Sequence, residues 1–144
     1  MDDKPLSDQF PVIEGRTMGF EERKYQHNWS QPNMMVTKPW GSYTDYYRTE
    51  KVVFKTICVK SGERLSLQSH EGRTELWYVV EGECVCELSG NILTLTEGMT
   101  IIIPRNSKHR LSNESSKMCV IAEMQYGDCS EEDIIRYEDD YNRK

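Results

Sequence analysis

The chain has 144 residues, of which 37% are hydrophobic and 29% charged, and its formal net charge is -6. This length accommodates one domain with its own core and is too short for two substantial ones. The acidic balance argues against broad binding to nucleic acid, and no apolar run approaches the roughly 20 residues of a membrane helix. We therefore expect no nucleic-acid partner, no membrane association and, without a signal peptide, a cytoplasmic location.

Residues 1–37 are rich in Asp, Glu, Gln, Asn and Pro, and no period of 2 or 3.6 runs through them. This composition predicts an extended N-terminal arm ahead of a single domain at residues 38–144. Apolar side chains such as Phe10, Phe20 and Trp29 are spaced along the arm. We expect such an arm to lie over its own barrel or across a partner subunit.

From Lys38 onward the sequence consists of short runs that favour β-strands. Glycines at 62, 72, 82, 90 and 98 punctuate these runs. Short strands at regular spacing predict an all-β sandwich or closed barrel, because βαβ units need helical patterns between the strands. The runs rich in β-branched, aromatic or alternating residues are 52–59, 64–70, 75–80, 84–88, 92–95, 99–103, 109–113 and 118–124.

The five cysteines include no Cys-x-x-Cys pair, so the sequence indicates neither a disulfide framework nor a thiolate zinc cluster. Cys58, Cys84, Cys86 and Cys119 fall in the strand-like runs. We expect these four to act as small buried hydrophobic residues.

Near the C-terminus the sequence has the pattern of a helix start. Ser130 followed by three acidic residues is a variant of the capping box, with negative charge in the first turn. Ile134, Ile135 and Tyr137 supply an apolar side. We therefore expect a short C-terminal helix.

Three residues between 68 and 75 carry groups that bind metal ions. In a strand, Gln68 and His70 point to the same face, because side chains alternate with a period of two. A turn at Glu71 and Gly72 would reverse the chain and place the Glu75 carboxylate on the neighbouring strand. These mixed nitrogen and oxygen donors form half of a metal site, and His109 is the histidine that the fold could bring to it.

Two spaced motifs around these residues resemble those of the cupin superfamily. The first is G-x5-Q-x-H-x4-E-x6-G over residues 62–82, in which glutamine replaces the first histidine of many cupins. The second is G-x5-P-x4-H-x3-N over residues 98–113. Asn106 stands where glycine is common, and we expect the turn to survive because asparagine tolerates a left-handed backbone. The resemblance implies a cupin-type jelly-roll β-barrel with the site in its mouth.

The flanking segments narrow the resemblance to the type II mannose-6-phosphate isomerase domain. Its matching stretches lie at 38–41, 64–77, 103–111 and 132–141, so it covers about 38–143. That domain often follows a mannose-1-phosphate guanylyltransferase domain in the same chain. Because only the arm precedes it here, we expect no guanylyltransferase domain. The resemblance implies interconversion of mannose 6-phosphate and fructose 6-phosphate through a cis-enediolate at a divalent ion (Zn, Mn, Co, Ni or Fe). By position, the implied metal ligands are Gln68, His70, Glu75 and His109.

The resemblance also implies catalytic roles near the metal. Arg73 is one candidate, in the pattern His-x-x-Arg-x-Glu, and Glu75 could act as a base only if its metal bond leaves an oxygen free. The sequence does not distinguish which residue acts as the general base. Beside His109, the side chains of Lys108 and Arg110 either bind the substrate phosphate or belong to a solvated loop.

Two departures from the family pattern support an alternative function. Leu76 stands where the family usually has a histidine after the glutamate, and the run before Arg73 lacks the usual histidines. The alternative is a non-catalytic metal-containing cupin that binds a sugar phosphate or sugar nucleotide. An oxygenase using bound iron is a third reading, which glutamine in place of histidine disfavours.

Because a small barrel has strand edges to cover, we also expect a homodimer.

Overall fold

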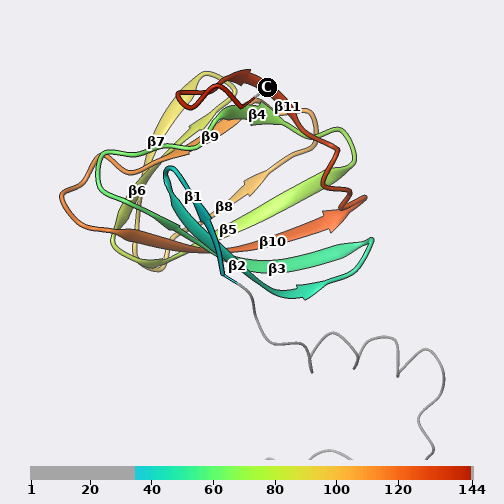
Figure 1. Ribbon diagram of the computed structural model, residues 1–144, viewed down its shortest axis with the longest axis horizontal. Helices are drawn as coiled ribbons and strands as arrows, with labels where there is room; N and C mark the ends of the chain where they lie inside the picture. Colours follow the sequence, from blue (N-terminus) through green and yellow to red (C-terminus); the bar gives the residue numbers. More distant parts are fainter. Residues whose placement is uncertain (1–34, 144) are drawn as a thin grey trace, which may run out of the picture. The chain divides into compact units, whose positions relative to one another are not determined.

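Residues 35–143, which the computed structural model describes, form eleven β-strands in two antiparallel sheets (Figure 1). One sheet has the strand order β1-β2-β3-β10-β5-β8 and the other β11-β4-β9-β6-β7. The strands are β1 (Met35–Lys38), β2 (Gly41–Arg48), β3 (Val52–Val59), β4 (Leu67–Ser69), β5 (Arg73–Glu81), β6 (Glu83–Leu88), β7 (Asn91–Thr96), β8 (Thr100–Ile103), β9 (His109–Ser112), β10 (Cys119–Gly127) and β11 (Ile135–Glu138).

These strands confirm the predicted all-β domain. The predicted arm lies outside the described residues except for its last three positions, which begin β1. Among residues 35–143 there is no helix with the length and apolar character needed to cross a membrane.

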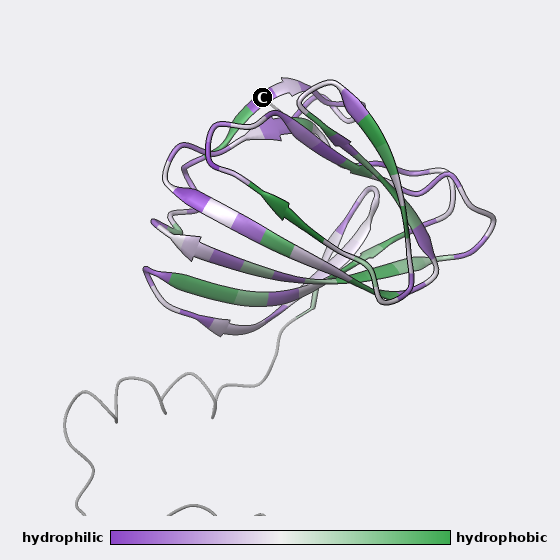
Figure 2. Cartoon of the chain, turned by 180° about the vertical axis from the view of Figure 1, so that it is seen from behind, coloured by the Kyte–Doolittle hydropathy of each residue, from purple (hydrophilic) through white to green (hydrophobic). Residues whose placement is uncertain are grey.

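Burial alternates along the strands and separates a buried inner face from an outer one. Figure 2 shows hydrophobic and hydrophilic segments following one another along the strands. On β5, Trp77 and Val79 are buried while Tyr78 and Val80 are exposed. The inner side chains of both sheets meet in one hydrophobic core, and Cys84, Cys86 and Cys119 belong to it, as expected, with Cys58 half-buried. The core is made of Trp40, Ile57, Val59, Trp77, Val79, Cys84, Cys86, Leu95, Ile103, Leu111, Cys119 and Ile121.

The turn before His109 keeps its shape with asparagine in place of glycine. Asn106 has a φ of 62°, in the left-handed region, and its N–H donates to the carbonyl of His70 at 2.7 Å. Asparagine adopts this region more readily than most residues. The turn therefore survives with asparagine, as the sequence predicted, and its hydrogen bond to His70 joins the two motifs.

The predicted C-terminal helix is wrong. Residues 130–134 form a turn without helix, and Ile135 starts strand β11, which pairs with β4. The Asp133 carboxylate, which was expected in the first helical turn, instead accepts hydrogen bonds from the N–H groups of Glu71 and Gly72. Ile134 and Ile135 are β-branched and favour a strand where an open sheet edge is available.

The expected pairing of the strands around Glu71 and Gly72 is also wrong. β4 pairs with β9 and β11, whereas β5 pairs with β8 and β10, so the two strands lie in different sheets. The turn carries the chain across the barrel. Residues before and after it consequently face each other across the interior instead of lying side by side.

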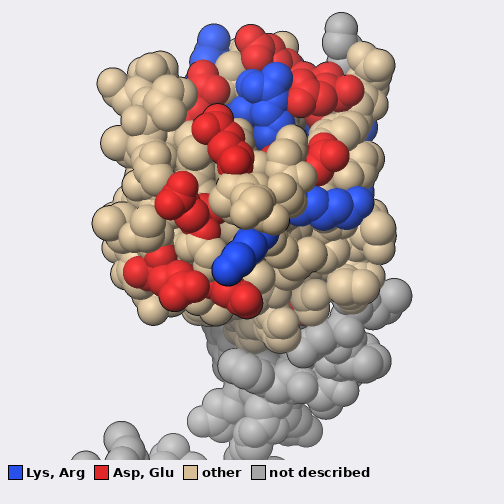
Figure 3. Space-filling model, turned by 90° about the vertical axis from the view of Figure 1, so that its left-hand side faces the viewer, with Lys and Arg blue, Asp and Glu red and all other residues tan. Residues whose placement is uncertain are grey.

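Charged side chains of both signs are scattered among uncharged ones on the face shown in Figure 3. Lys and Arg stand among Asp and Glu on this face rather than forming a continuous basic area.

Candidate metal centre

The two sheets bring the four predicted ligands together from three strands. Gln68 lies on β4, where it pairs with His109 at the start of β9, and His70 follows β4 directly. Glu75 faces them from the inner side of β5 in the other sheet. We call these four residues the ligand cluster.

Within the ligand cluster, Glu75 lies between the two imidazoles. Its Oε1 is 3.1 Å from His70 Nε2 and its Oε2 is 3.4 Å from His109 Nε2. All three side chains are 2% exposed, and one donor atom from each lies within 4.8 Å of the others. Three donors at this spacing are close enough to share one metal ion.

Hydrogen bonds to carbonyl oxygens fix the tautomer of both histidines. His70 Nδ1 lies 2.6 Å from the carbonyl oxygen of Asp133, and His109 Nδ1 lies 2.9 Å from that of Ser107. A carbonyl oxygen can only accept, so each Nδ1 carries a proton and donates it. In a neutral imidazole the Nε2 atom then presents a lone pair, and both Nε2 atoms face Glu75.

The environment of Glu75 favours a cation. Burial opposes its ionisation, but interactions with His109, His70 and Glu123 outweigh that effect and hold its pKa well below the usual range. His109 Nε2 has no hydrogen-bond partner within the described chain and faces the ionised carboxylate. Two acceptors in contact repel unless a proton or a metal ion lies between them, so these residues fit a divalent metal.

Gln68 is oriented by its neighbours. Its Oε1 accepts a hydrogen bond from Ser66 Oγ at 2.9 Å, and its Nε2 lies 3.4 Å from His70 Nε2. A half-turn of the amide exchanges the two atoms, with Ser66 Oγ then accepting from the amide nitrogen. Either way, one amide atom of Gln68 faces the imidazole of His70.

Arg73 touches the same atoms that would bind the metal. Its Nε donates to Glu75 Oε1 at 3.2 Å, and its Nη2 donates to His70 Nε2 at 3.1 Å. Because a guanidinium has only donors, His70 Nε2 must accept, which agrees with the tautomer set by Asp133. Arg73 is therefore a fixed cation at the edge of the ligand cluster.

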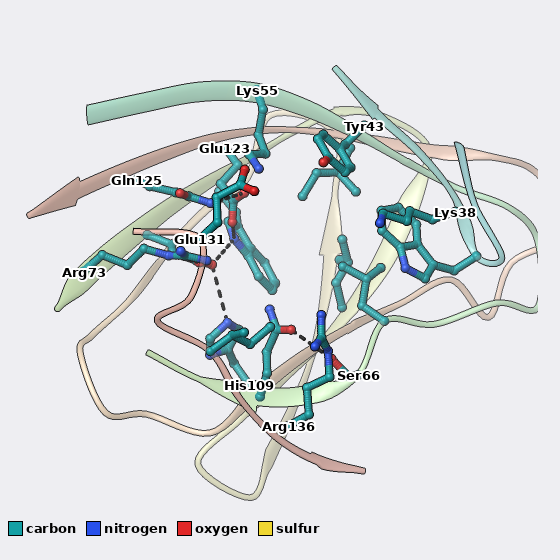
Figure 4. Close-up of a pocket in the computed structure, with 18 of the residues that line it drawn as sticks. Lys38, Tyr43, Lys55, Ser66, Arg73, His109, Glu123, Gln125, Glu131 and Arg136 are labelled. Carbon is teal, nitrogen blue, oxygen red and sulfur yellow. Dashed lines mark hydrogen bonds and ion pairs between the residues drawn. The ribbon is translucent and has the colours of Figure 1, made fainter. Parts of the chain in front are cut away.

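A cavity of about 230 Å³ opens from the ligand cluster, with Gln68, Glu75 and His109 in its wall. Figure 4 shows Arg73, Glu123 and His109 converging on the interior. Glu123 accepts a hydrogen bond from Trp77 Nε1 at 2.9 Å. Its burial and the neighbouring charge of Glu75 raise its pKa to about 8.

Sequence reasoning missed Glu123 and its neighbour Gln125. Both are buried on β10 and alternate with outward residues in register with Ile121 of the core. Polar residues at the inward positions of a strand are an available signal, because burying them without partners is costly. Here Gln125 Nε2 donates to Glu123 at 3.2 Å.

The basic residues predicted from the sequence do not line this cavity. Lys108 lies 4.1 Å from the centre of the Tyr137 ring, and Arg110 is buried with its Nη2 3.1 Å from Glu138. The wall instead contains Lys38, Arg48, Lys55, Arg136 and Arg143.

Only some of these wall residues have ionic partners. Lys55 pairs with Asp45 at 3.4 Å and Arg143 with Asp139 at 2.6 Å. No carboxylate among residues 35–143 lies within ion-pair distance of Lys38 or Arg136. We call these two residues the cationic pair. Figure 4 shows Lys38 across the cavity from Arg73, and Arg136 extending inward beside Ser66.

Comparison with known proteins identifies the domain. The sequence profile of the family described as mannose-6-phosphate isomerase C-terminal matches residues 24–139. The chain belongs to this family. Among curated proteins similar to it, AlgA of Pseudomonas putida, an alginate biosynthesis protein, is 40% identical over 115 residues. XanB of Xanthomonas campestris, a xanthan biosynthesis protein, is 38% identical over 109 residues, as is the mannose-1-phosphate guanylyltransferase ManC of Salmonella typhimurium.

These relatives of the mannose-6-phosphate isomerase C-terminal family are much longer than the chain. The matches cover 75% to 79% of this chain but only 23% to 24% of XanB, AlgA and ManC. The chain thus spans about a quarter of their length. The activity named for a whole relative is not thereby assigned to the shared domain.

Solved structures show the fold. CapF, a capsular polysaccharide assembling protein from Staphylococcus aureus, gives a TM-score of 0.66 at 20% identity, over 76% of this chain and 35% of CapF. The cupin domain of Schizosaccharomyces pombe Cnp3 gives 0.57 at 10% identity, over 67% of this chain and 87% of that one. The predicted cupin-type barrel is confirmed.

Proposed function

We propose that this domain interconverts mannose 6-phosphate and fructose 6-phosphate at a divalent metal held by Gln68, His70, Glu75 and His109. The observation that carries the proposal is the ligand cluster itself, in which two imidazole lone pairs and an ionised carboxylate converge without a hydrogen-bond donor for His109. Membership of the mannose-6-phosphate isomerase C-terminal family supplies the substrate class.

A bound divalent ion would polarise the sugar carbonyl and stabilise negative charge on an enediolate, which typically contributes several kcal/mol. Side chains of the protein must bind the substrate and move the proton. Arg73 has its guanidinium beside the ligand cluster, where it can donate hydrogen bonds to a substrate oxygen. Because a guanidinium has only hydrogen-bond donors, the role of Arg73 is to bind and orient the substrate rather than to remove a proton.

Proton transfer between the two carbons needs a carboxyl group that is not itself a ligand of the metal. Both oxygens of Glu75 are engaged, Oε1 with His70 and Arg73, and Oε2 with His109 and Trp77. Glu123 lines the cavity outside the ligand cluster and, with a pKa of about 8, exchanges its proton near neutral pH. We assign the proton to a Glu123 oxygen.

The cationic pair is suited to the substrate phosphate. Lys38 and Arg136 line the cavity without an ionic partner among the described residues, so their charge is available to an anion. The small cavity favours a sugar phosphate over a larger sugar nucleotide, since pockets for drug-sized ligands run from roughly 300 Å³ upward.

The proposal is tested by a coupled assay of purified protein that has been treated with chelator and then given Zn²⁺, Mn²⁺, Co²⁺ or Ni²⁺. Restored turnover with at least one ion is the expected result. Binding of mannose 6-phosphate without turnover under every metal would replace the isomerase with a non-catalytic sugar-phosphate-binding cupin. His109→Ala protein serves as the matched sample, because it keeps the cavity but loses one ligand.

A further inference from the structure

The chain after β10 returns to the ligand cluster from outside. We call residues 128–143 the C-terminal strap. Its strand β11 pairs with β4, placing Arg136 opposite Gln68, and its first residue, Asp128, donates its N–H to the carbonyl of Gly72 at 2.8 Å. The strap therefore borders the ligand cluster on both sides of His70.

Asp133 in the strap holds this region with two different groups. Its carboxylate accepts hydrogen bonds from the N–H of Glu71 at 2.9 Å and from the N–H of Gly72 at 2.8 Å. Its backbone carbonyl accepts the Nδ1–H of His70 at 2.6 Å. One residue thus binds both the imidazole of a ligand and the two peptide groups that follow that ligand.

The carbonyl and the carboxylate of Asp133 both determine which nitrogen of His70 is protonated and where its Nε2 points. The carbonyl keeps the proton on Nδ1 and leaves the Nε2 lone pair directed at Glu75, while the carboxylate fixes the distance between the strap and the backbone beyond His70. Loss of the carboxylate would let the carbonyl move away from Nδ1. The imidazole could then rotate away from Arg73 Nη2, which donates to its Nε2, and its proton could exchange between the two nitrogens.

Gly72 shows how closely the strap must approach. A Cβ at this position would lie 2.8 Å from the Cβ of Asp128 and 3.1 Å from Oδ2 of Asp133. Neither distance leaves room for a methyl group without displacing the strap. The contact between the strap and the turn after His70 therefore depends on a residue without a side chain.

We propose that Asp133 is a positioning residue of the metal centre, which sets the tautomer and direction of His70 through the strap. This inference rests on the metal centre in the proposed function. It concerns metal affinity and not turnover, so it is tested by metal binding on the intact chain.

The test compares Asp133→Ala and Asp133→Asn with Asp140→Ala, measured by titrating Co²⁺ against a competing chelator and following the visible absorption of the bound ion. Asp140 belongs to the same strap and holds Arg64 through two hydrogen bonds, away from His70. We expect Asp133→Ala to weaken Co²⁺ binding by about 10–100-fold, as for other outer partners of a ligand histidine. Asparagine keeps one acceptor oxygen, so Asp133→Asn should fall between Asp133→Ala and the wild type.

A second measurement separates positioning from general stability. Long-range proton–nitrogen spectra of the metal-free protein report which imidazole nitrogen carries the proton. We expect the Nδ1–H form of His70 in the wild type and in Asp140→Ala, and a mixture in Asp133→Ala. Gly72→Ala, which retains the Asp133 side chain but displaces it together with the strap, should reproduce the mixture.

The outcomes distinguish the two proposals. A wild-type protein that binds no divalent ion would overturn the metal centre. Wild-type binding together with unchanged affinity and an unchanged tautomer in Asp133→Asn would overturn the role of Asp133 alone, even if Asp133→Ala failed to fold.

Discussion

The ligand cluster and the cationic pair are two parts of one cavity with opposite construction. The side chains of His70, Glu75 and His109 are 2% exposed and are held by hydrogen bonds to the protein. Arg136 is exposed and Lys38 half-buried, and neither has an ion-pair partner among the described residues. A buried, oriented cluster suits an ion that remains bound, whereas available charge at the rim suits an anion that enters and leaves.

The largest expected effect follows from removing a ligand. His109→Ala should lower the affinity for divalent metal by more than about 100-fold, beyond the range typical of outer partners. Metal content after dialysis, measured by mass spectrometry, checks this. The substitution removes the His109 Nε2 atom that faces the Glu75 carboxylate without a hydrogen-bond partner. The metal-free protein should therefore stay folded, as seen by circular dichroism. Unchanged metal content would show that the ligand cluster is not the metal site.

The second effect should appear when Arg136 of the cationic pair is removed, and it should leave metal binding unchanged. Arg136→Ala removes a charge-assisted contact worth about 1.5–3 kcal/mol, so the KM for mannose 6-phosphate should rise about 10-fold or more with normal metal content. Arg64→Ala is the matched control, since Arg64 pairs with Asp140 and does not line the cavity. An equal rise in both variants would argue against a phosphate contact at Arg136.

The sequence allowed prediction of the barrel and the ligand cluster, because both depend on local spacing. Alternation placed Gln68 and His70 on one face, and the second motif supplied His109. Glu75 was expected on a strand paired with that of Gln68, and it reaches the ligand cluster from the other sheet instead. The cationic pair depends on which distant strands meet, and that information lies in the sheet order. Lys38 at the end of β1 and Arg136 on β11 reach one cavity only because β11 pairs with β4.

The C-terminal helix was mispredicted for a related reason. The acidic residues after Ser130 have the composition of a helix start, yet Asp133 finds its donors on Glu71 and Gly72, far away in the sequence. A local pattern cannot show that a better partner exists elsewhere in the fold.

A smaller effect concerns Glu123, a buried carboxyl group in the wall of the same cavity. The pKa of Glu123 is raised from its ordinary value of 4.5 to about 8, so the folded protein holds a proton that the unfolded chain releases. The metal-free protein should therefore lose stability as pH rises from about 4.5 to about 8, by up to a few kcal/mol. Glu123→Gln should flatten this dependence in urea titrations at several pH values. Glu131→Gln, at a side chain that is 69% exposed, should keep the wild-type slope.

The smallest effect is expected at the position that most clearly departs from the family pattern. Leu76 lies between Glu75 and Trp77, which both face inward, and it pairs on the sheet with Met124 and Ile102.

The side chain of Leu76 therefore points to the outer face, where strand alternation keeps it away from the cavity. Leu76→His, which restores the family's histidine, should change kcat and metal affinity by less than about twofold, because neither the ligand cluster nor the cationic pair is altered. A large gain in turnover would mean that the outer face of β5 acts on the reaction. The non-catalytic reading based on this residue would then regain its force.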